Sequence, residues 1–434
     1  MFFRKKKKKR VFVLGLDGVP HTLIKEMSAK GLIPNIARII GTGYFYKMKV
    51  TIPEISSVSW PSFMTGKNPG EHGIFGFTDF KPASYNIRFP SYRDIKIKTI
   101  WDILDEKGLK SVVLNQPSTY PARKINGAMV SGFVALDLAK SVYPFSLKTE
   151  LEKFQYMIDI DTTKCKDNPS LLLEQLDWSL NTREKAMDLL WNDIDWDYFE
   201  MVITGTDRLQ HYLWDAFFNI QHPYHMKFVE YYNKLDAFIG KIYNRFVEKS
   251  NTIDPEDSFF ILSDHGFTGI KQEFNINVWL ASEGYLKFDV QEPENLAQIS
   301  SDSKAFAIDP GRIYINIDGK FPQGCVRFSD VKSLNDEIKA KLEAIQFNGD
   351  KVIRKVFERD EIYSGPFSNY SSDLVILTNH GYDVKGSIKK RDVFDRTSFT
   401  GMHTWDDAMF FSKKPYKEDL FITDLAEFII SRFN

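Results

Sequence analysis

Three carboxylates and two imidazoles stand in short motifs that follow apolar, strand-like runs of the sequence. Asp17 ends the run RVFVLGLDGV, and the pair Asp264–His265 ends SFFILSDHGF. Asp207 and His211 follow WDYFEMVITG and lie four residues apart. At that spacing in a helical turn, both side chains project from one face and can chelate a single ion.

A third imidazole, His403, precedes a strand-like run in GMHTWDDAMFF instead of following one. Taken alone, each motif has a plain structural explanation, such as a chance surface pair or a satisfied structural histidine. Together they make a mixed nitrogen and oxygen set that suits zinc or manganese better than calcium. The only two cysteines, Cys165 and Cys325, lie far apart without CxxC spacing, so a thiolate site or disulfide framework is not indicated.

Hydroxyl groups cluster in the stretch TIPEISSVSWPSFMTGKNPGEHGIFGF, residues 51–77. A helix is predicted from near Ser56 to Gly66. A hydroxyl at a helix start lies beside unpaired backbone N–H groups and the positive end of the helix dipole, which favours bound phosphate. The alternative is that Ser56 or Ser57 serves only as the N-cap.

The elements that must position these residues alternate between strand and helix, which indicates an α/β fold with a mostly parallel sheet. Ligands bind at the carboxyl ends of the strands in such sheets, so the motifs are expected to converge there. Helical spacing runs from His21 to Ile40, and residues 227–246 form an amphipathic stretch. We expect a single domain, residues 1–434, with a helical cap inserted at 140–195 and a second insertion at 290–360.

The composition excludes several classes of partner. The 434 residues hold 57 lysines and arginines against 58 aspartates and glutamates, so no global field favours nucleic acid or anionic lipid. No apolar run approaches the roughly 20 residues that a membrane-spanning helix needs. The start MFFRKKKKKR is not expected to be a secretion signal, because the apolar run after it is short and contains Asp17, and no cleavage site follows. The charges from Arg4 to Arg10 are expected to form a solvated arm, with weak adhesion to RNA or acidic lipid as the alternative. Cytoplasmic residence is expected, since the cysteines indicate no disulfide framework.

The sequence resembles the alkaline phosphatase superfamily, in its type I phosphodiesterase/nucleotide pyrophosphatase branch, and within it the group of predicted phosphohydrolases or phosphomutases. The resemblance runs through LGLDGV, SSVSWPSFMTGKNPGEHGIFGF, TIWDIL, NQPSTYP, TGTDRLQHYLW, LSDHGF, INVWL, INIDGKFPQG and GMH, so it covers nearly the whole chain. It implies a three-layer sandwich in which helices flank a mostly parallel central sheet.

The resemblance also implies roles for individual residues. The family's nucleophile is a Thr or Ser ten residues before the Gly of the TG pair, and counting back from Gly66 gives Ser56. Ser57 is the second candidate and is expected to bind substrate, and Ser59 is the third, because adjacent hydroxyls replace the Thr-x-Pro-Ala-Trp pattern of many relatives. The implied ligands are Asp17, Ser56, Asp264 and His265 for one metal, and Asp207, His211 and His403 for the other.

The function implied is that of a two-metal phosphohydrolase that cleaves a phosphodiester or pyrophosphate bond through a covalent phosphoserine. Zinc is the favoured metal and manganese the alternative. The expected partner is a small phosphate ester such as a nucleotide, without specific nucleic-acid binding. A phosphomutase or phosphotransferase, or a phosphomonoesterase, with the same metal site is the alternative. A sulfatase fits less well, because no Pro-x-Arg follows Ser56, and a metal-stabilised binding protein is a further reading.

Overall fold

A computed structural model describes residues 8–249 and 255–434, so part of the basic arm predicted at Arg4–Arg10 lies outside the described residues. The chain divides into two compact units. The larger unit contains the chain up to Lys67, Ser91–Phe267 and His403–Asn434, and the smaller unit contains Asn68–Pro90 and Thr268–Met402.

An eight-stranded sheet forms the centre of the larger unit, in the order β2-β21-β9-β1-β8-β5-β6-β7. Five neighbouring strands, β9, β1, β8, β5 and β6, run parallel, whereas β21 is antiparallel to β9 and β7 is antiparallel to β6. The bounds are β1 Val11–Leu16, β2 Tyr44–Met48, β5 Ser111–Gln116, β6 Gly127–Ser131, β7 Val142–Tyr143, β8 Tyr198–Ile203, β9 Phe259–Leu262 and β21 Ala408–Ser412. The mostly parallel α/β sheet expected from the sequence is confirmed.

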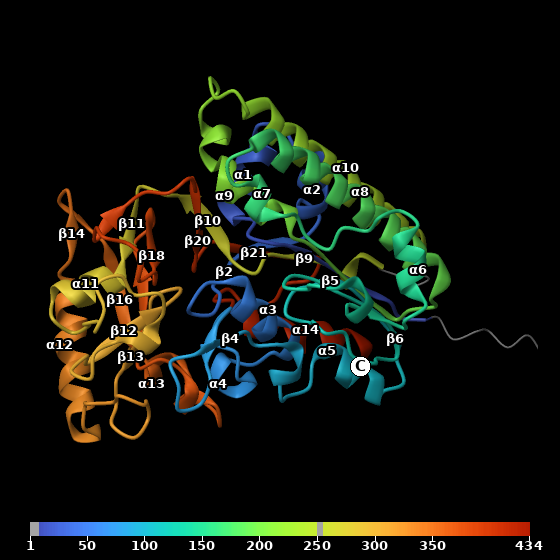
Figure 1. The fold of residues 1–434 in the computed structure, drawn as a ribbon. Coiled ribbons are helices and arrows are strands. Elements are labelled where there is room, and N and C mark those ends of the chain that lie inside the picture. Colours follow the sequence, from blue (N-terminus) through green and yellow to red (C-terminus); the bar gives the residue numbers. More distant parts are fainter. Residues whose placement is uncertain (1–7, 250–254) are drawn as a thin grey trace, which may run out of the picture. The chain divides into compact units, whose positions relative to one another are not determined.

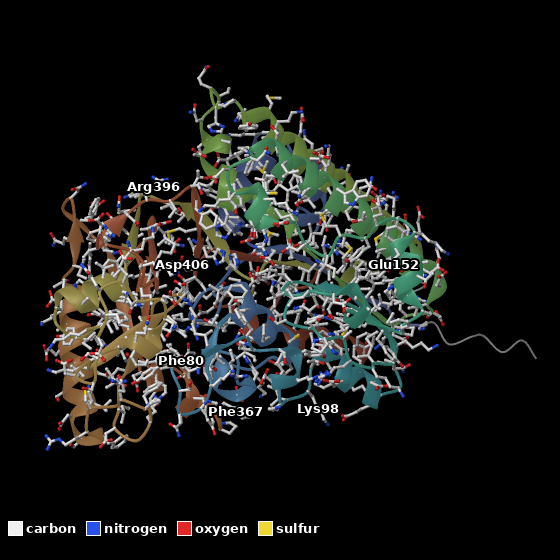
Figure 2. All side chains as sticks on the ribbon, viewed as in Figure 1. Phe80, Lys98, Glu152, Phe367, Arg396 and Asp406 are labelled. Atoms are coloured by element: carbon white, nitrogen blue, oxygen red, sulfur yellow. The ribbon has the colours of Figure 1, made fainter. Side chains whose placement is uncertain are left out.

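Helices cover both faces of this sheet (Figure 1). One layer contains α1 (His21–Ala29), α2 (Pro34–Ile40), α8 (Pro169–Asp193), α9 (Gly205–Phe218) and α10 (His225–Lys249), and the other contains α3 (Ser56–Thr65), α5 (Ile100–Glu106) and α14 (Leu425–Ile430). Strands β1, β5 and β8 are buried along their whole length, as near-continuous apolar runs in a covered parallel sheet should be. Side chains fill the space between the sheet and its helices (Figure 2).

The stretch from His21 to Ile40, which has helical spacing throughout, forms two helices instead of one. Helix α1 ends at Ala29, and α2 begins at Pro34. Gly31 between them has φ 70°, in the left-handed region that glycine adopts readily. Proline lacks an N–H donor and suits the first position of a new helix, so the chain turns here although the apolar spacing continues.

The smaller unit has its own apolar core and several short sheets. Its main sheet has the order β12-β13-β17-β16, and a second contains β18-β11-β19. The bounds in this part of the chain are α4 Pro69–His72, β3 Asp79–Phe80, β4 Ile87–Arg88, β10 Gly266–Gly269, β11 Gln272–Asn275, α11 Ile276–Ser282, β12 Ala305–Ile308, β13 Arg312–Ile315, α12 Val331–Glu343, β14 Gln346–Phe347, β15 Asp350–Lys351, β16 Ile353–Glu358, α13 Arg359–Ile362, β17 Leu374–Thr378, β18 Tyr382–Lys385, β19 Phe394–Asp395 and β20 Gly401–Thr404.

The two segments expected as insertions lie in different units. Residues 140–195 belong to the larger unit and contain α6 (Leu147–Glu152), α7 (Thr162–Cys165) and α8, whereas residues 290–360 belong to the smaller unit. A single domain with these two insertions stays a prediction. Within residues 8–249 and 255–434, no helix combines the length and apolar character that crossing a membrane requires.

Candidate metal centre and active site

Three carboxylates meet at the carboxyl ends of three neighbouring parallel strands. Asp17 directly follows β1, Asp264 lies two residues after β9, and Asp207 lies in the first turn of α9, which follows β8. Because β9, β1 and β8 are adjacent in the sheet, these residues converge at one edge. All three side chains are buried, as is that of His265. The sequence prediction that the motifs meet at this edge is confirmed.

The first cluster contains Asp17, Asp264 and His265, with Ser56 beside them. Nε2 of His265 lies 3.6 Å from Oδ1 of Asp17 and 3.5 Å from Oδ2 of Asp264. The hydroxyl of Ser56 donates to Oδ1 of Asp17 over 3.1 Å and lies 3.2 Å from Nε2 of His265. The backbone N–H of Gly18 donates to Oδ1 of Asp264 over 3.0 Å. The four side chains therefore direct oxygen and nitrogen atoms at one point.

The second cluster contains Asp207, His211 and His403. Oδ1 of Asp207 lies 3.4 Å from Nε2 of His211 and 3.1 Å from Nε2 of His403, and the two Nε2 atoms are 3.0 Å apart. His265 also reaches this cluster, because its Nε2 lies 3.8 Å from the same oxygen. The ligand atoms of Asp207, His265 and His403 lie within 4.8 Å of one another, as do those of Asp17, Asp264 and His265.

The tautomers show that these clusters suit cations. Nδ1 of His265 lies 3.0 Å from the carbonyl oxygen of Gly266, and Nδ1 of His403 lies 2.9 Å from that of Glu54. A carbonyl accepts only from N–H, so each Nδ1 carries the proton, and each neutral ring presents an Nε2 lone pair to carboxylate oxygens. Oδ2 of Asp264 is buried and has no hydrogen-bond partner among the described residues. A cation between these groups would bind the Nε2 lone pairs and the carboxylate oxygens together, and this nitrogen and oxygen set fits zinc or manganese.

The pKa values of the clustered residues are shifted by their burial and by their charged neighbours. Burial, followed by the carboxylates of Asp264 and Asp207, raises the pKa of Asp17 well above its ordinary value. Burial also raises the pKa of Asp264 to about 7 and lowers the pKa of His265 to about 4. Burial alone would raise the pKa of Asp207, but His211, His403 and Arg208 outweigh it and hold that pKa well below its ordinary value. Without bound cations, keeping all of these ligand groups in their metal-binding protonation states therefore costs free energy.

Helix α3 carries the candidate nucleophiles at its start. Ser56 is its first residue, and the first helical hydrogen bonds run from the N–H groups of Val58 and Ser59 to the carbonyl of Ile55. The N–H groups of Ser56 and Ser57 precede those bonds and are suited to an anion. The hydroxyl of Ser57 is buried without a hydrogen-bond partner among the described residues.

Ser59, the third candidate nucleophile, has a different hydrogen-bond partner. The hydroxyl of Ser59 lies 3.2 Å from that of Thr51. Among the described residues, Ser56 is the one of the three serines that forms hydrogen bonds with Asp17 and His265. The predicted helix start and the predicted end at Gly66, which has φ 65°, are confirmed.

Sequence reasoning did not assign positions at the site to three residues that shape it. The indole Nε1 of Trp60 donates to Oδ2 of Asp17 over 3.2 Å. Arg208 donates from Nη1 to Oδ2 of Asp207 over 2.7 Å, and Asp159 in turn binds Arg208. Trp60 lies in the serine motif and Arg208 follows Asp207 directly, so both were visible, but only the fold brings in Asp159.

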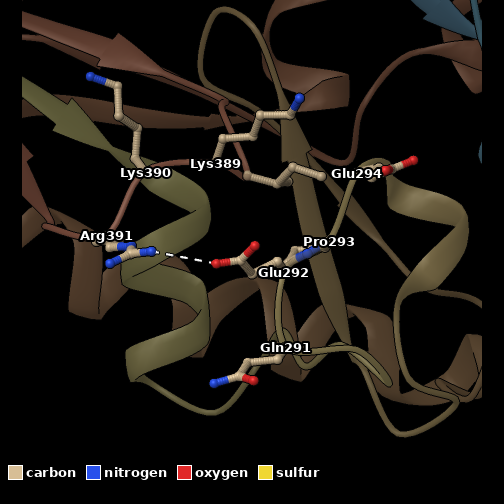
Figure 3. Close-up of a pocket in the computed structure, with 8 residues that line it drawn as sticks. Gln291, Glu292, Pro293, Glu294, Lys389, Lys390 and Arg391 are labelled. Atoms are coloured by element: carbon tan, nitrogen blue, oxygen red, sulfur yellow. Dashed lines mark ion pairs between the residues drawn. The ribbon is translucent and has the colours of Figure 1, made fainter.

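The smaller unit has a separate concave region, shown in Figure 3, with a volume of about 620 Å³. It is lined by residues 291–294 and 388–391. Three of its charged groups form ion pairs, since Arg391 lies 3.6 Å from Glu292 and Lys390 pairs with Asp395. Neither metal-ligand cluster involves it, so we place the chemistry in the larger unit.

Solved structures with the same fold include several phosphorus-processing enzymes. Phosphonoacetate hydrolase from Sinorhizobium meliloti 1021, in complex with phosphonoacetate, is 14% identical with a TM-score of 0.64, over 99% of this chain and 96% of that one. Murine ectonucleotide pyrophosphatase/phosphodiesterase 5 in complex with AMP is 12% identical with a TM-score of 0.57, over 98% and 95%. The alkaline phosphatase PafA is 13% identical with a TM-score of 0.60, over 99% and 96%. At these identities the likeness concerns the fold.

A comparison with curated protein sequences finds no match. The family match is extensive, because residues 11–406 fit the family described as type I phosphodiesterase / nucleotide pyrophosphatase. Family and the two buried clusters define a phosphohydrolase with a candidate two-metal site. The chain belongs to the type I phosphodiesterase / nucleotide pyrophosphatase family.

Proposed function

We propose that this protein cleaves a phosphodiester or pyrophosphate bond in a small phosphate ester through a covalent intermediate on Ser56. One observation carries the proposal: the Ser56 hydroxyl lies 3.1 Å from Asp17 and 3.2 Å from Nε2 of His265, at the first residue of a helix. Membership of the type I phosphodiesterase family supports the class of bond.

The two clusters supply the ligands for a pair of divalent cations. Asp17, Asp264 and His265 would hold one beside Ser56, and Asp207, His211 and His403 would hold the other. Zinc is the proposed metal, with manganese as the alternative, because the ligands are imidazole and carboxylate. Such a pair of cations, when bound, lowers the pKa of an adjacent hydroxyl and stabilises charge on the entering and departing oxygens of phosphoryl transfer.

The chain's own groups account for the remaining steps. The Ser56 hydroxyl loses its proton as its oxygen forms a bond to phosphorus. The bond from phosphorus to the leaving oxygen breaks, and that oxygen keeps the bonding pair and takes up a proton. The N–H groups of Ser56 and Ser57 precede the helical hydrogen bonds, so they can orient phosphoryl oxygens. Water then bonds to phosphorus, and the Ser56 oxygen departs. The released phosphate or phosphomonoester therefore carries one oxygen from water.

The direct test is to trap the intermediate. Wild-type protein loaded with zinc or manganese would be acid-quenched during turnover of bis-p-nitrophenyl phosphate or a nucleotide, and the phosphorylated peptide would be located by mass spectrometry. We expect a p-nitrophenyl-phosphoryl or nucleotidyl group on Ser56 in wild type, because displacement of one ester leaves the other on phosphorus. No such adduct should form in Ser56→Ala, which should also lose turnover. Ser57→Ala is the matched control and should still form the adduct on Ser56. Equal turnover by wild type and Ser56→Ala would overturn the assignment.

Oxygen-18 water separates hydrolysis from transfer to a second hydroxyl. Hydrolysis places one labelled oxygen in the product, whereas a phosphomutase or phosphotransferase returns an unlabelled phosphoryl group to an acceptor. Monoester and diester substrates in the same assay distinguish a phosphomonoesterase from the diesterase proposed here. Cytoplasmic residence stays a prediction from the sequence.

A further inference from the structure

Arg208 lies between a candidate metal ligand and a second carboxylate. Its Nη1 donates to Oδ2 of Asp207 over 2.7 Å. On its other side, Nη2 and Nε donate to Oδ2 of Asp159 over 2.7 and 3.2 Å. The side chain of Arg208 is 14% exposed and that of Asp159 10%. The planar fork of a guanidinium fixes direction as well as charge, so Arg208 holds the two carboxylates at set positions.

Asp159 and Arg208 are themselves fixed by further contacts. Oδ1 of Asp159 accepts from the Thr204 hydroxyl over 3.2 Å and from the backbone N–H of Ile160 over 3.0 Å. Thr204 is the N-cap residue of α9, the helix that carries Asp207. The ring of Phe133 lies with its centroid 4.4 Å from the guanidinium carbon of Arg208. The guanidinium therefore has partners on two edges and an aromatic ring on one face.

In this arrangement the two carboxylate oxygens of Asp207 have different partners. Oδ1 faces the imidazoles, at 3.1 Å from Nε2 of His403 and 3.4 Å from Nε2 of His211. Oδ2 is occupied by Arg208. One carboxylate oxygen with two imidazoles is the kind of three-ligand set that zinc accepts with an open fourth position. A carboxylate free to offer both oxygens suits ions with higher coordination numbers, such as manganese.

We infer that Arg208, held in place by Asp159, is a positioning residue that restricts Asp207 to one ligating oxygen and so gives this cation position its preference for zinc. The inference rests on the proposed function, because it takes Asp207, His211 and His403 as ligands of one cation. Arg208 needs no contact with substrate for this role.

Suitable variants can separate the effect of the charges on Arg208 and Asp159 from the effect of the orientation that they give to Asp207. Replacing Arg208 alone would leave the buried Asp159 uncompensated, and the added negative charge would attract any cation. Replacing Asp159 alone would do the reverse. The double variant Arg208→Met/Asp159→Asn removes one positive and one negative charge together, so its effect on metal binding reports orientation.

The chain offers a matched control in another arginine with the same kind of surroundings. Arg245 forms an ion pair with Asp188, and its guanidinium carbon lies 4.7 Å from the ring centroid of Trp191. Neither residue belongs to the two clusters. Arg245→Met/Asp188→Asn thus removes a more exposed pair of opposite charges, with side chains 25% and 39% exposed, elsewhere in the larger unit.

The test is to measure zinc and manganese binding to metal-free full-length wild type, double variant and control by calorimetry with chelator competition. We expect wild type and control to bind two ions per chain with the same affinities. The double variant should bind zinc about 10–100-fold more weakly at one site, the usual effect of losing an outer partner of a ligand. Its manganese affinity should change less, so the zinc-to-manganese ratio should fall.

If the double variant does not fold, the Arg208→Lys variant tests the inference about zinc preference instead. Lysine keeps the charge balance but lacks the fork, so the same loss of zinc preference is expected. Unchanged zinc and manganese affinities in a folded variant would overturn the inference and leave the proposed function intact. Unchanged metal binding with a raised KM for every phosphate ester would assign Arg208 to the substrate instead and would also overturn it. Wild type that binds neither metal would end both proposals.

Discussion

Oγ of Ser56 lies 3.1 Å from Oδ1 of Asp17, although 39 residues separate them in the chain. Ser56 is the first residue of α3, and Asp17 directly follows β1. A helix N-terminus is thereby placed at the carboxyl end of a central parallel strand, where backbone N–H groups, a hydroxyl and buried carboxylates meet. This juxtaposition combines an anion site with a cation site, which is what phosphoryl transfer requires.

Trp60 should orient Asp17 through its indole N–H. Trp60→Phe removes the 3.2 Å hydrogen bond to Oδ2 of Asp17 from a fully buried side chain. We expect a loss of about 1–3 kcal/mol in the free energy of unfolding and a fall of roughly 10–100-fold in kcat/KM. Urea denaturation and steady-state kinetics measure the two effects.

The control for that change is Trp101→Phe. Trp101 is equally buried, and its Nε1 donates to the Tyr92 hydroxyl over 2.7 Å, outside the two clusters. This variant should lose similar stability but keep its kcat/KM. If both variants lost activity to the same extent, the effect would be one of general packing and not of Asp17.

The close packing of His265 and Asp207 against Gly18 can be tested by adding a methyl group there. It has φ 68°, and a Cβ there would lie 3.0 Å from Cε1 of His265 and 3.3 Å from Oδ1 of Asp207. Gly18→Ala should therefore cost about 1–2 kcal/mol in backbone strain and displace the His265 ring. Gly31→Ala has the same backbone strain at φ 70° with nothing within 4 Å. Only Gly18→Ala should lose turnover and zinc affinity, and equal effects in both would contradict the prediction.

The convergence of Asp17, Asp207 and Asp264 could be predicted because it depends on local patterns. Each residue follows an apolar run of strand length, and parallel strands present their carboxyl ends at one edge. The start of α3 was equally local, since hydroxyl groups and the terminal Gly66 mark its two ends. Those features need no knowledge of which distant segments touch.

The other contacts at the site depend on tertiary packing. Asp159 and Arg208 are 49 residues apart, and no period or motif indicates that they pair. The division of the chain into two units was not predicted either, because the smaller unit is built from two separate segments, Asn68–Pro90 and Thr268–Met402. The break between α1 and α2 was signalled by Gly31 and Pro34, but the continuous apolar spacing obscured it.

Metal removal should lower the thermal stability of the protein. Asp17, Asp207 and Asp264 are buried together, and their mutual repulsion is relieved when cations bind. A ligand that binds only the folded state at 100 times its Kd adds about 2.7 kcal/mol per site. We expect Tm, measured by scanning calorimetry, to fall on chelation and to recover with zinc.

Asp264→Asn makes this prediction specific. Because burial raises the pKa of Asp264 to about 7, its carboxyl destabilises the metal-free protein at neutral pH. The metal-free variant should therefore melt at or above the Tm of metal-free wild type, yet gain less from zinc because a ligand is gone. A variant that melts lower without metal and gains as much with it would argue against a ligand role for Asp264.

Glu200, which belongs to neither metal cluster, should make the stability of the protein depend on pH. It lies on β8, fully buried, where it accepts a 2.5 Å hydrogen bond from the Tyr198 hydroxyl, and burial raises its pKa from 4.5 to about 8. Between those values the unfolded chain releases this proton and the folded protein keeps it. The free energy of unfolding therefore falls as pH rises from 4.5 to about 8, by up to roughly 1.4 kcal/mol per pH unit.

Glu200→Gln removes that titration. Relative to wild type, the variant's urea midpoint should rise between pH 5.5 and pH 8, because only wild type loses stability from Glu200 over this interval. Asp195→Asn is the control, since hydrogen bonds from Arg10 and Lys8 hold the Asp195 pKa at about 2, below the interval. Its midpoint should differ from wild type by the same amount at both pH values. A Glu200→Gln difference that is equally flat would show that Glu200 is already ionised in the folded protein at pH 5.5.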